Sequence, residues 1–209
     1  MKDLKEIGFY TLSDDRARTI SEYSQMQRCE LIITEYCNFR CPYCRGLKSE
    51  IYQDRQNKQL TLDEIKSIID IWCKDKPLKN IRFSGGEPTI HPNIVEIIGY
   101  AKDKGIERIA ISTNGSADWS LYEKLVNVGC NDFSVSLDGC CASDINKMAG
   151  VSNVDLFAKI SSNIRGLSTL TYVTVGIVLT PDNVNKTIDT IMYADSLGVS
   201  DIRIISAAQ

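Results

Sequence analysis

The stretch GIERIAISTNGSADWSLYEKLVNVGCNDFSVS, residues 105–136, decides the fold because it spans one complete strand–helix–strand unit. Two short apolar runs, 108–112 and 132–136, each begin three residues after a glycine, Gly105 and Gly129. Glycine commonly takes the left-handed position at which a helix ends. A helical pattern lies between the two runs, so the unit predicts two parallel strands joined by a helix.

The same alternation continues on both sides of this unit. Thr61-Leu62-Asp63-Glu64 form a capping box, which predicts a helix that begins at Leu62 and ends before Pro77. The expected strands are 29–34, 80–84, 108–112, 132–136, 171–179 and 201–205, and the other expected helices are 93–104, 119–128, 154–167 and 184–197. Strands that alternate with helices predict a parallel sheet of the α/β class. Because a closed barrel needs eight such units and about 250 residues, we expect a partial (β/α)6 TIM-like barrel.

The domain organisation follows from the same pattern. We expect one core domain over residues 29–209, preceded by an N-terminal extension over residues 1–28. The extension covers either the mouth or the base of the barrel, and the sequence leaves both places open. The chain stops four residues after the sixth expected strand, so a truncation of the core at that point also stays open.

The expected strands have two different faces. Their large apolar residues share one parity and should face the helices. The opposite parity, which should face inward, holds Arg82, Ser84, Ala110, Ser112, Ser134, Ser136 and Arg203. A packed barrel interior prefers Val, Ile and Leu, so this polar set predicts a hydrated cavity for a polar ligand. The alternative is that some of these residues only satisfy one another.

The first expected strand ends at a cysteine-rich loop, YCNFRCPYC, residues 36–44. Cys37, Cys41 and Cys44 have the spacing C-x3-C-x2-C, which arises by chance in about one such chain in a hundred. Three thiolates leave one iron of a four-iron cluster without a protein ligand, whereas structural zinc sites and electron-transfer clusters usually have a fourth ligand. The loop therefore predicts a reactive iron–sulfur cluster.

The composition narrows the class of protein further. The net charge is −3, from 24 basic and 27 acidic residues, which gives no electrostatic support for nucleic-acid binding. There is no run of 18 apolar residues, and residues 1–6 lack the apolar core that is typical of a signal peptide. We expect a cytoplasmic protein, outside membranes, whose eight cysteines are reduced. The single histidine, His91, argues against a His-rich metal site or a Ser-His-Asp hydrolase, and is expected in a turn or cap.

Further motifs follow the next three expected strands. They are Gly85-Gly86-Glu87-Pro88, Ser112-Thr113-Asn114-Gly115 and Ser136-Leu137-Asp138-Gly139. Together with the cysteine loop and its Tyr43, they resemble the radical S-adenosylmethionine (SAM) superfamily over residues 29–206. The likeness is greatest to the branch that contains the GTP cyclase of molybdenum-cofactor synthesis and the peptide-modifying maturases.

The resemblance implies a [4Fe-4S] cluster on Cys37, Cys41 and Cys44, with SAM chelated to the open iron. It implies reductive cleavage of SAM to methionine and a 5′-deoxyadenosyl radical, which abstracts hydrogen from a small-molecule or peptide substrate that stays unidentified. A reductant such as flavodoxin or ferredoxin is implied as well.

The resemblance also implies the SAM contacts. Tyr43 is expected near the adenine, and Arg203 near the SAM carboxylate. Backbone groups of Gly85 and Gly86 are expected at the methionine amino group. Glu87 is expected to orient this turn or a substrate, and a hydrogen bond that only braces the turn is the alternative. The remaining expected SAM-binding residues are Ser112, Asn114, Ser136 and Asp138.

The other cysteines have separate expectations. Cys140 and Cys141 follow the fourth expected strand, where a thiol could return a hydrogen atom to a substrate radical; an incidental pair of loop thiols is the alternative. Cys29, Cys73 and Cys130 are expected to be small buried hydrophobes.

Three other functions stay open beside the radical enzyme. One is an activase that installs a glycyl radical on a partner protein, and another is a non-catalytic iron–sulfur electron carrier. The last is a zinc-binding interaction module, which the absence of a fourth nearby ligand disfavours.

Overall fold

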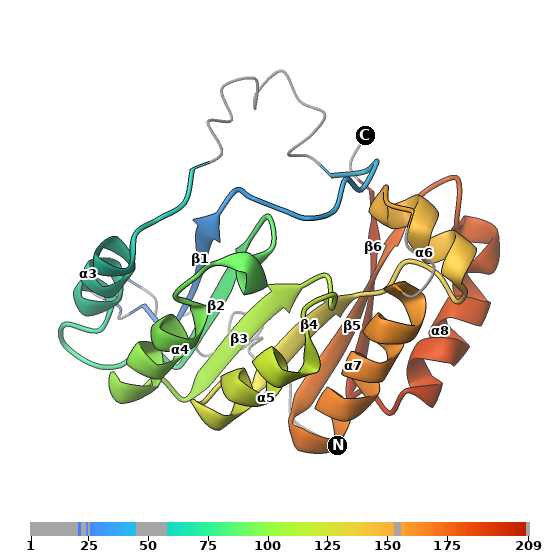
Figure 1. Ribbon diagram of the computed structural model, residues 1–209. Helices are drawn as coiled ribbons and strands as arrows, with labels where there is room; N and C mark the ends of the chain where they lie inside the picture. Colours follow the sequence, from blue (N-terminus) through green and yellow to red (C-terminus); the bar gives the residue numbers. More distant parts are fainter. Residues whose placement is uncertain (1–20, 22–23, 25, 45–57, 153–155, 208–209) are drawn as a thin grey trace.

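The computed structural model describes residues 21, 24, 26–44, 58–152 and 156–207, so most of the expected N-terminal extension lies outside the described residues. A single parallel sheet forms its centre, with six strands in the order of the chain (Figure 1). The strands are β1 Arg28–Thr34, β2 Asn80–Gly85, β3 Arg108–Thr113, β4 Asp132–Ser136, β5 Tyr172–Leu179 and β6 Asp201–Ser206. The expected partial barrel is therefore confirmed: β1 and β6 form the two open edges of the sheet.

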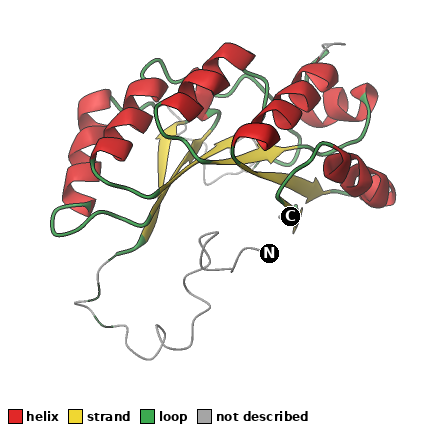
Figure 2. Ribbon diagram, turned by 90° about the horizontal axis from the view of Figure 1, so that it is seen from below, coloured by secondary structure: helices red, strands yellow, loops and turns green. Residues whose placement is uncertain are grey.

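The helices follow the strands in regular alternation. They are α3 Leu62–Trp72, α4 Ile94–Asp103, α5 Trp119–Asn127, α6 Ala142–Ala149, α7 Leu156–Leu170 and α8 Thr187–Ser196, with short 3-10 turns η3 Pro88–Ile90 and η4 Val184–Lys186. They pack along one face of the curved sheet, and α6 lies near the end at which the strands terminate (Figures 1 and 2). None of the described helices combines the length and the hydrophobicity that a bilayer crossing requires.

The two strand faces have the expected orientation. The residues that face the helices are fully buried in the core, and they include Ile81, Phe83, Ile109, Ile111 and Phe133. The opposite parity is aligned across the sheet: Arg82 pairs with Ala110, Ser112 with Ser134, and Gly176 with Arg203. The sheet therefore has one apolar face under the helices and one polar, inward face.

Helix ends also form where the sequence predicts them. The capping box at α3 is present, with Glu64 N donating to Thr61 Oγ1 and Thr61 N donating to Glu64 Oε2. Gly105, Gly129 and Gly198 all have positive φ, at 79°, 118° and 81°, directly after α4, α5 and α8. These residues end the helices because glycine has no Cβ to oppose that conformation.

The helix α6 was not expected. Its sequence, ASDINKMA, has few apolar residues, and three of them, Ile145, Met148 and Ala149, are buried. So short a helix is marginal by itself, and tertiary packing supplies its stability. Elsewhere, segment 184–197 divides into η4 and α8, and α7 runs to Leu170 rather than Leu167; residues 153–155 lie outside the described part.

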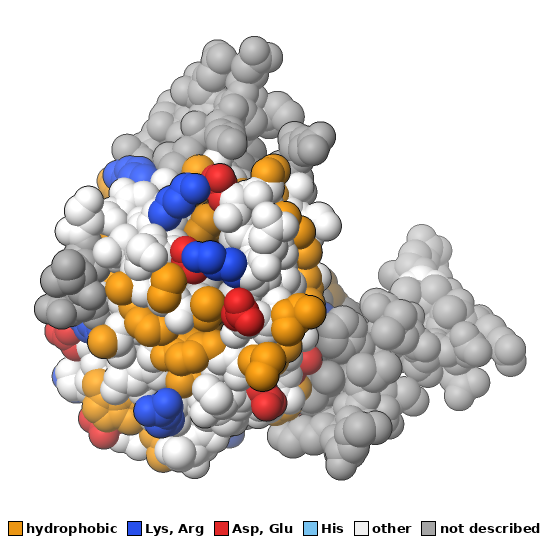
Figure 3. Space-filling view, turned by 90° about the vertical axis from the view of Figure 1, so that its right-hand side faces the viewer, with side chains coloured by type: hydrophobic (Ala, Val, Ile, Leu, Met, Phe, Trp, Pro, Cys, Tyr) orange, Lys and Arg blue, Asp and Glu red, His pale blue; other side chains and the backbone are white. Residues whose placement is uncertain are grey.

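Apolar side chains are exposed on the side of the molecule formed by η4, α8 and β6. Val184, Ile188 and Met192 are exposed on η4 and α8, and so are Ile204 and Ile205 on β6. Figure 3 shows apolar side chains gathered on this side of the molecule, with charged groups among them. Ile204 pairs with buried Ile177 of β5, so its exposure reflects its place on an edge strand rather than a change of parity.

Candidate active site

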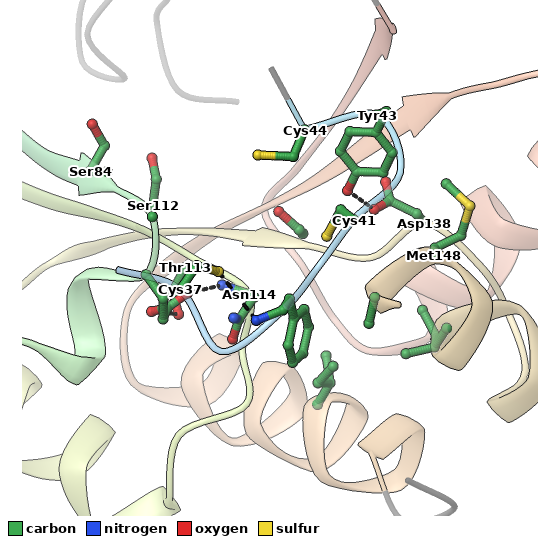
Figure 4. Close-up of a pocket in the computed structure, with 18 residues that line it drawn as sticks. Cys37, Cys41, Tyr43, Cys44, Ser84, Ser112, Thr113, Asn114, Asp138 and Met148 are labelled. Carbon is green, nitrogen blue, oxygen red and sulfur yellow. Dashed lines mark hydrogen bonds between the residues drawn. The ribbon is translucent and has the colours of Figure 1, made fainter. Parts of the chain in front are cut away.

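The cysteine loop after β1 forms one wall of a cavity of about 230 Å³ (Figure 4). The loop contributes Cys37, Cys41 and Cys44, which are free and partly exposed thiols. The ends of β2, β3 and β4 and the loops after them contribute the polar wall, which consists of Ser84, Gly85, Gly86, Glu87, Ser112, Thr113, Asn114, Ser136 and Asp138. Phe39, Ile145, Met148, Ala149 and Ile160 form the apolar wall. Parallel α/β sheets commonly bind ligands at this end.

The three thiols belong to one loop and line one cavity. Among the described residues, no three Cys, His, Asp or Glu side chains converge closely enough to hold one ion. A four-iron cluster takes each thiolate on a different iron, so its ligands do not have to converge on one point. Burial raises the pKa of Cys37, and it raises the pKa of Cys41 to about 11. Because cysteine binds iron as a thiolate, binding of a cluster at these residues would release protons.

The loop is fastened to α6, the helix that sequence reasoning missed. Arg40 N donates to Ala149 O over 2.7 Å, and the Arg40 guanidinium donates to Cys37 O over 2.7 Å. Gly150 has φ of 66°, and a Cβ there would lie 2.4 Å from Arg40 O. The chain thus passes so close to the cysteine loop at residue 150 that only glycine fits.

A second connection joins the loop to the end of β3. Asn38 Nδ2 donates to Ser116 Oγ over 2.9 Å, and Asn114 Nδ2 donates to Asn38 Oδ1 over 2.8 Å. Asn114 Oδ1 in turn accepts from Ser116 N over 3.0 Å. Asn114 was expected to bind SAM, and its side chain already braces the cysteine loop. Asn38 was not among the expected site residues, because nothing in the sequence distinguishes it from a spacer between two cysteines.

Glu87 is a fully buried carboxylate that joins β2 to β3. Its Oε1 accepts from Thr113 Oγ1 over 2.7 Å and from Thr89 N over 3.0 Å, and its Oε2 accepts from Asn114 N over 2.7 Å. Burial raises the pKa of Glu87, and these hydrogen bonds oppose that rise. Both oxygens thus have partners in the protein, and they join the turn after β2 to the end of β3.

The two glycines before Glu87 allow the β2 turn to approach the end of β1. A Cβ on Gly85 would lie 2.1 Å from Thr34 O, and a Cβ on Gly86 would lie 2.0 Å from Tyr36 O. Gly86 N donates to Thr34 O over 2.8 Å. The glycines therefore fix the start of the cysteine loop against β2, in addition to any contact with a ligand.

Tyr43 and Asp138 meet across the cavity. The Tyr43 hydroxyl donates to Asp138 Oδ2, and Val178 N donates to Asp138 Oδ1 over 2.6 Å. Burial raises the pKa of both Tyr43 and Asp138. The pair connects the cysteine loop to the end of β4 and to β5.

Three expected site residues lie outside the lining of this cavity. Arg203 makes an ion pair with Asp201 over 3.0 Å, on the inward face of β6. Cys140 and Cys141 come just before α6, where Cys141 Sγ lies 3.2 Å from Ser143 Oγ. The residues that line the cavity, which omit all three, include the other expected SAM-binding residues and the three cluster cysteines.

The chain belongs to the radical SAM superfamily, whose family model matches residues 31–194. Its cofactors are accordingly a [4Fe-4S] cluster and SAM. Cys37, Cys41 and Cys44 are the residues that fit the cluster, since they are free and line one cavity.

Curated relatives include the GTP 3′,8-cyclase of Synechococcus elongatus, 31% identical over 135 residues, which are 63% of this chain and 40% of the relative. The probable GTP 3′,8-cyclase of Sulfurisphaera tokodaii is 27% identical over 178 residues, 83% of this chain and 53% of the relative. The chain thus spans about half or less of the length of these relatives.

Solved structures share the fold. Streptococcus suis SuiB bound to S-adenosylmethionine matches with a TM-score of 0.72 at 15% identity, over 89% of this chain and 42% of SuiB. The anSMEcpe protein with bound AdoMet matches with a TM-score of 0.65 at 15% identity, over 89% of this chain and 52% of that one.

Proposed function

We propose that this chain is the core of an enzyme that cleaves SAM reductively and abstracts hydrogen from a substrate. The observation that carries the proposal is the cavity in which three free thiols of one loop face the polar ends of β2, β3 and β4. The bound cofactors supply the radical chemistry: an electron from the cluster cleaves SAM to methionine and a 5′-deoxyadenosyl radical, which takes a hydrogen atom from the substrate.

In this proposal the chain's own residues bind and orient the two cofactors and shield the radical from water. Cys37, Cys41 and Cys44 hold the cluster in this proposal. The SAM contacts proposed for the polar wall are Tyr43, Gly85, Gly86, Glu87, Ser112, Asn114, Ser136 and Asp138, with Arg203 proposed for the carboxylate. The apolar wall, which contains Phe39 and Met148, keeps water from a reactive radical. The hydrogen-donor role of Cys140 and Cys141 also stays a proposal, to be tested by C140A and C141A.

GTP is the first substrate to test. The relatives named above are a GTP 3′,8-cyclase and a probable one, and Arg82 on the inward face of the sheet is a cation suited to an anionic group. The guanidinium of Arg82 reaches Ser112 Oγ over 3.4 Å, while its Nε is buried without a hydrogen-bond partner among the described residues. A phosphate oxygen would accept a hydrogen bond from that donor.

Anaerobic reconstitution with iron and sulfide, followed by dithionite and SAM, tests the enzyme. We expect 5′-deoxyadenosine as a product and a further increase when GTP is added, with ATP as the matched nucleotide. R82A should raise the KM for GTP at least tenfold, whereas R165A, on the exposed surface of α7, should leave it unchanged. A reconstituted cluster that yields no 5′-deoxyadenosine would favour the electron carrier.

The substrate experiment also separates the remaining possibilities. If 5′-deoxyadenosine forms and GTP has no effect, the GTP assignment is wrong, and a glycyl radical on a partner protein becomes the next product to measure by EPR. Flavodoxin or ferredoxin is the proposed physiological reductant, in the cytoplasm, and either one should replace dithionite in the assay.

A further inference from the structure

A closed ring of three hydrogen bonds joins the cysteine loop to the loop after β3. Asn38 Nδ2 donates to Ser116 Oγ over 2.9 Å, and Ser116 Oγ donates to Asn114 Oδ1 over 2.7 Å. Asn114 Nδ2 closes the ring, because it donates to Asn38 Oδ1 over 2.8 Å. Within the ring each side chain gives one hydrogen and accepts one, so the three bonds strengthen one another.

A backbone group fixes the direction of this ring. Ser116 N donates to Asn114 Oδ1 over 3.0 Å, so that oxygen faces residue 116 and the Asn114 NH2 group faces Asn38. Asn38 meets this NH2 group with its own oxygen, which leaves the Asn38 NH2 group for the Ser116 hydroxyl. Although Asn38 is exposed, both ends of its amide are therefore held.

The loop after β3 is a firm anchor for the ring. Asn163 on α7 is only 3% exposed, and its Nδ2 donates to Gly115 O and to Ala117 O, each over 2.9 Å. Asn114 N donates to the buried Glu87 carboxylate over 2.7 Å. The ring is therefore attached to backbone that is itself fixed to α7 and to the turn after β2.

The peptide group after Asn38 reaches a sulfur atom. The N–H of this peptide group, which belongs to Phe39, donates to Cys37 Sγ over 3.4 Å. Because a peptide group is planar, the direction of this N–H depends on where Asn38 is held. Cys37 is one of the three cysteines proposed to hold the cluster, and both Cys37 and Asn114 line the cavity (Figure 4).

We infer that Asn38 is a positioning residue, which holds the Phe39 amide on the Cys37 sulfur and thereby makes the cluster easier to reduce. The inference rests on the proposed function, in which reduction of the cluster precedes cleavage of SAM. Reduction adds negative charge to a cluster, and a hydrogen-bond donor at a ligand sulfur stabilises that charge. Loss of the ring should therefore loosen this donor and shift the reduction potential to a more negative value.

The first test breaks the ring at two different places. N38A deletes the amide and S116A deletes the hydroxyl, and we expect each to shift the midpoint potential of the reconstituted cluster to a more negative value. Redox titration with EPR detection, without SAM, measures this potential. Because both changes break one ring, the double variant should shift the potential no further than either single variant. Additive shifts would overturn the inference, and so would an N38A potential equal to that of the wild-type chain.

Pulsed EPR provides a direct readout of the donor itself. Among the described residues that line the cavity, Phe39 is the one phenylalanine. In protein labelled with ¹⁵N-phenylalanine, the reduced wild-type cluster should show a hyperfine coupling to the Phe39 nitrogen, and N38A should weaken that coupling. A wild-type cluster without the coupling would contradict the inference, even if N38A and S116A failed to hold iron.

Asn131 provides a matched control, since its side chain also joins two segments. Its Nδ2 donates to Glu107 O over 2.8 Å, and its Oδ1 accepts from Ile109 N over 2.9 Å, at the amino end of β3. N131A should leave the potential and the coupling unchanged, and so should S116T, which keeps the hydroxyl. A shift in N131A equal to that in N38A would show a general effect of lost stability and would overturn the inference.

Failure of the proposed function is recognised separately. It would appear as a wild-type cluster that forms no 5′-deoxyadenosine, whereas the inference is judged on the potential of the cluster and on its coupling to the Phe39 nitrogen.

Discussion

At the scale of single residues, Glu87 shows how a buried charge organises the cavity. Its carboxylate accepts hydrogen bonds from Thr113, Asn114 and Thr89, which belong to two different strand ends. A buried carboxylate is costly unless it is fully hydrogen-bonded. Because every one of its bonds points toward the backbone or hydroxyl of a neighbouring loop, Glu87 fixes the geometry of the polar wall.

The first prediction concerns E87Q. The amide replaces one acceptor by a donor, so Asn114 N or the Thr89 and Thr113 donors lose their partner. We expect the free energy of unfolding to fall by about 1–3 kcal/mol, measured by urea denaturation of the apo-protein. E96Q is the control, since exposed Glu96 only pairs with Lys66 on the surface, and it should change stability little. Equal losses for both variants would show that Glu87 has no special structural role.

At the scale of secondary-structure elements, α6 supports the cysteine loop. Two features join them: the hydrogen bond from Arg40 N to Ala149 O, and the close approach of Gly150 to Arg40 O. The helix is in turn connected to η4 by the ion pair between Asp144 and Lys186, at 2.8 Å. Two segments far from the cysteine loop in the sequence, α6 and η4, are therefore connected to it directly or through one another.

The second prediction compares G150A with G198A. Both glycines have positive φ, at 66° and 81°, so alanine costs roughly 1–2 kcal/mol at each. At residue 150 the new Cβ also meets Arg40 O at 2.4 Å, whereas at residue 198 the nearest atom is 3.9 Å away. We expect G150A to lose a further ~1–3 kcal/mol and to retain less iron after reconstitution. Similar iron content in the two variants would contradict a role for α6 in holding the loop.

At the scale of the whole molecule, the inward face of the sheet has two different ends. At the carboxyl ends of the strands lies the cavity with the cysteines. Toward their amino ends, charged side chains satisfy one another: Arg108 pairs with Asp132 over 2.7 Å, and Arg108 also lies over the Tyr172 ring. The sequence left open whether inward polar residues serve a ligand or one another. At the amino ends they serve one another, and at the carboxyl ends they line a cavity.

The third prediction concerns this charged end. Asp132 is 1% exposed and is the carboxylate partner of Arg108, and its charge also offsets that of Arg82. D132N removes the negative charge but keeps the shape, so two buried guanidinium groups lose their counter-charge. We expect a loss of about 3–5 kcal/mol in the free energy of unfolding. D118N, which breaks the exposed pair with Lys159, should leave stability unchanged. A D132N variant as stable as wild type would show that this pair does not stabilise the sheet.

Much of the architecture was predictable from the sequence because local patterns determine it. Alternating apolar residues give the strands and their two faces, the box at Thr61–Glu64 begins α3, and Gly105 and Gly129 end their helices. The cysteine spacing likewise determines which residues can hold a cluster, since it is a property of one loop. The helix α6 was not predicted, because its few apolar residues are stabilised by long-range packing rather than by a strong local pattern.

The contacts between distant segments were decided by the tertiary structure alone. Cysteine-loop residue Asn38 bonds to Ser116 and Asn114, 78 and 76 positions away, and Tyr43 bonds to Asp138, 95 positions away. No periodicity or motif encodes such pairs, because a hydrogen bond between side chains depends on atomic positions that the packed sheet fixes. The sequence by itself determined the sheet, its polar face and the loop of three cysteines proposed as cluster ligands. The folded chain decided which neighbours surround those ligands.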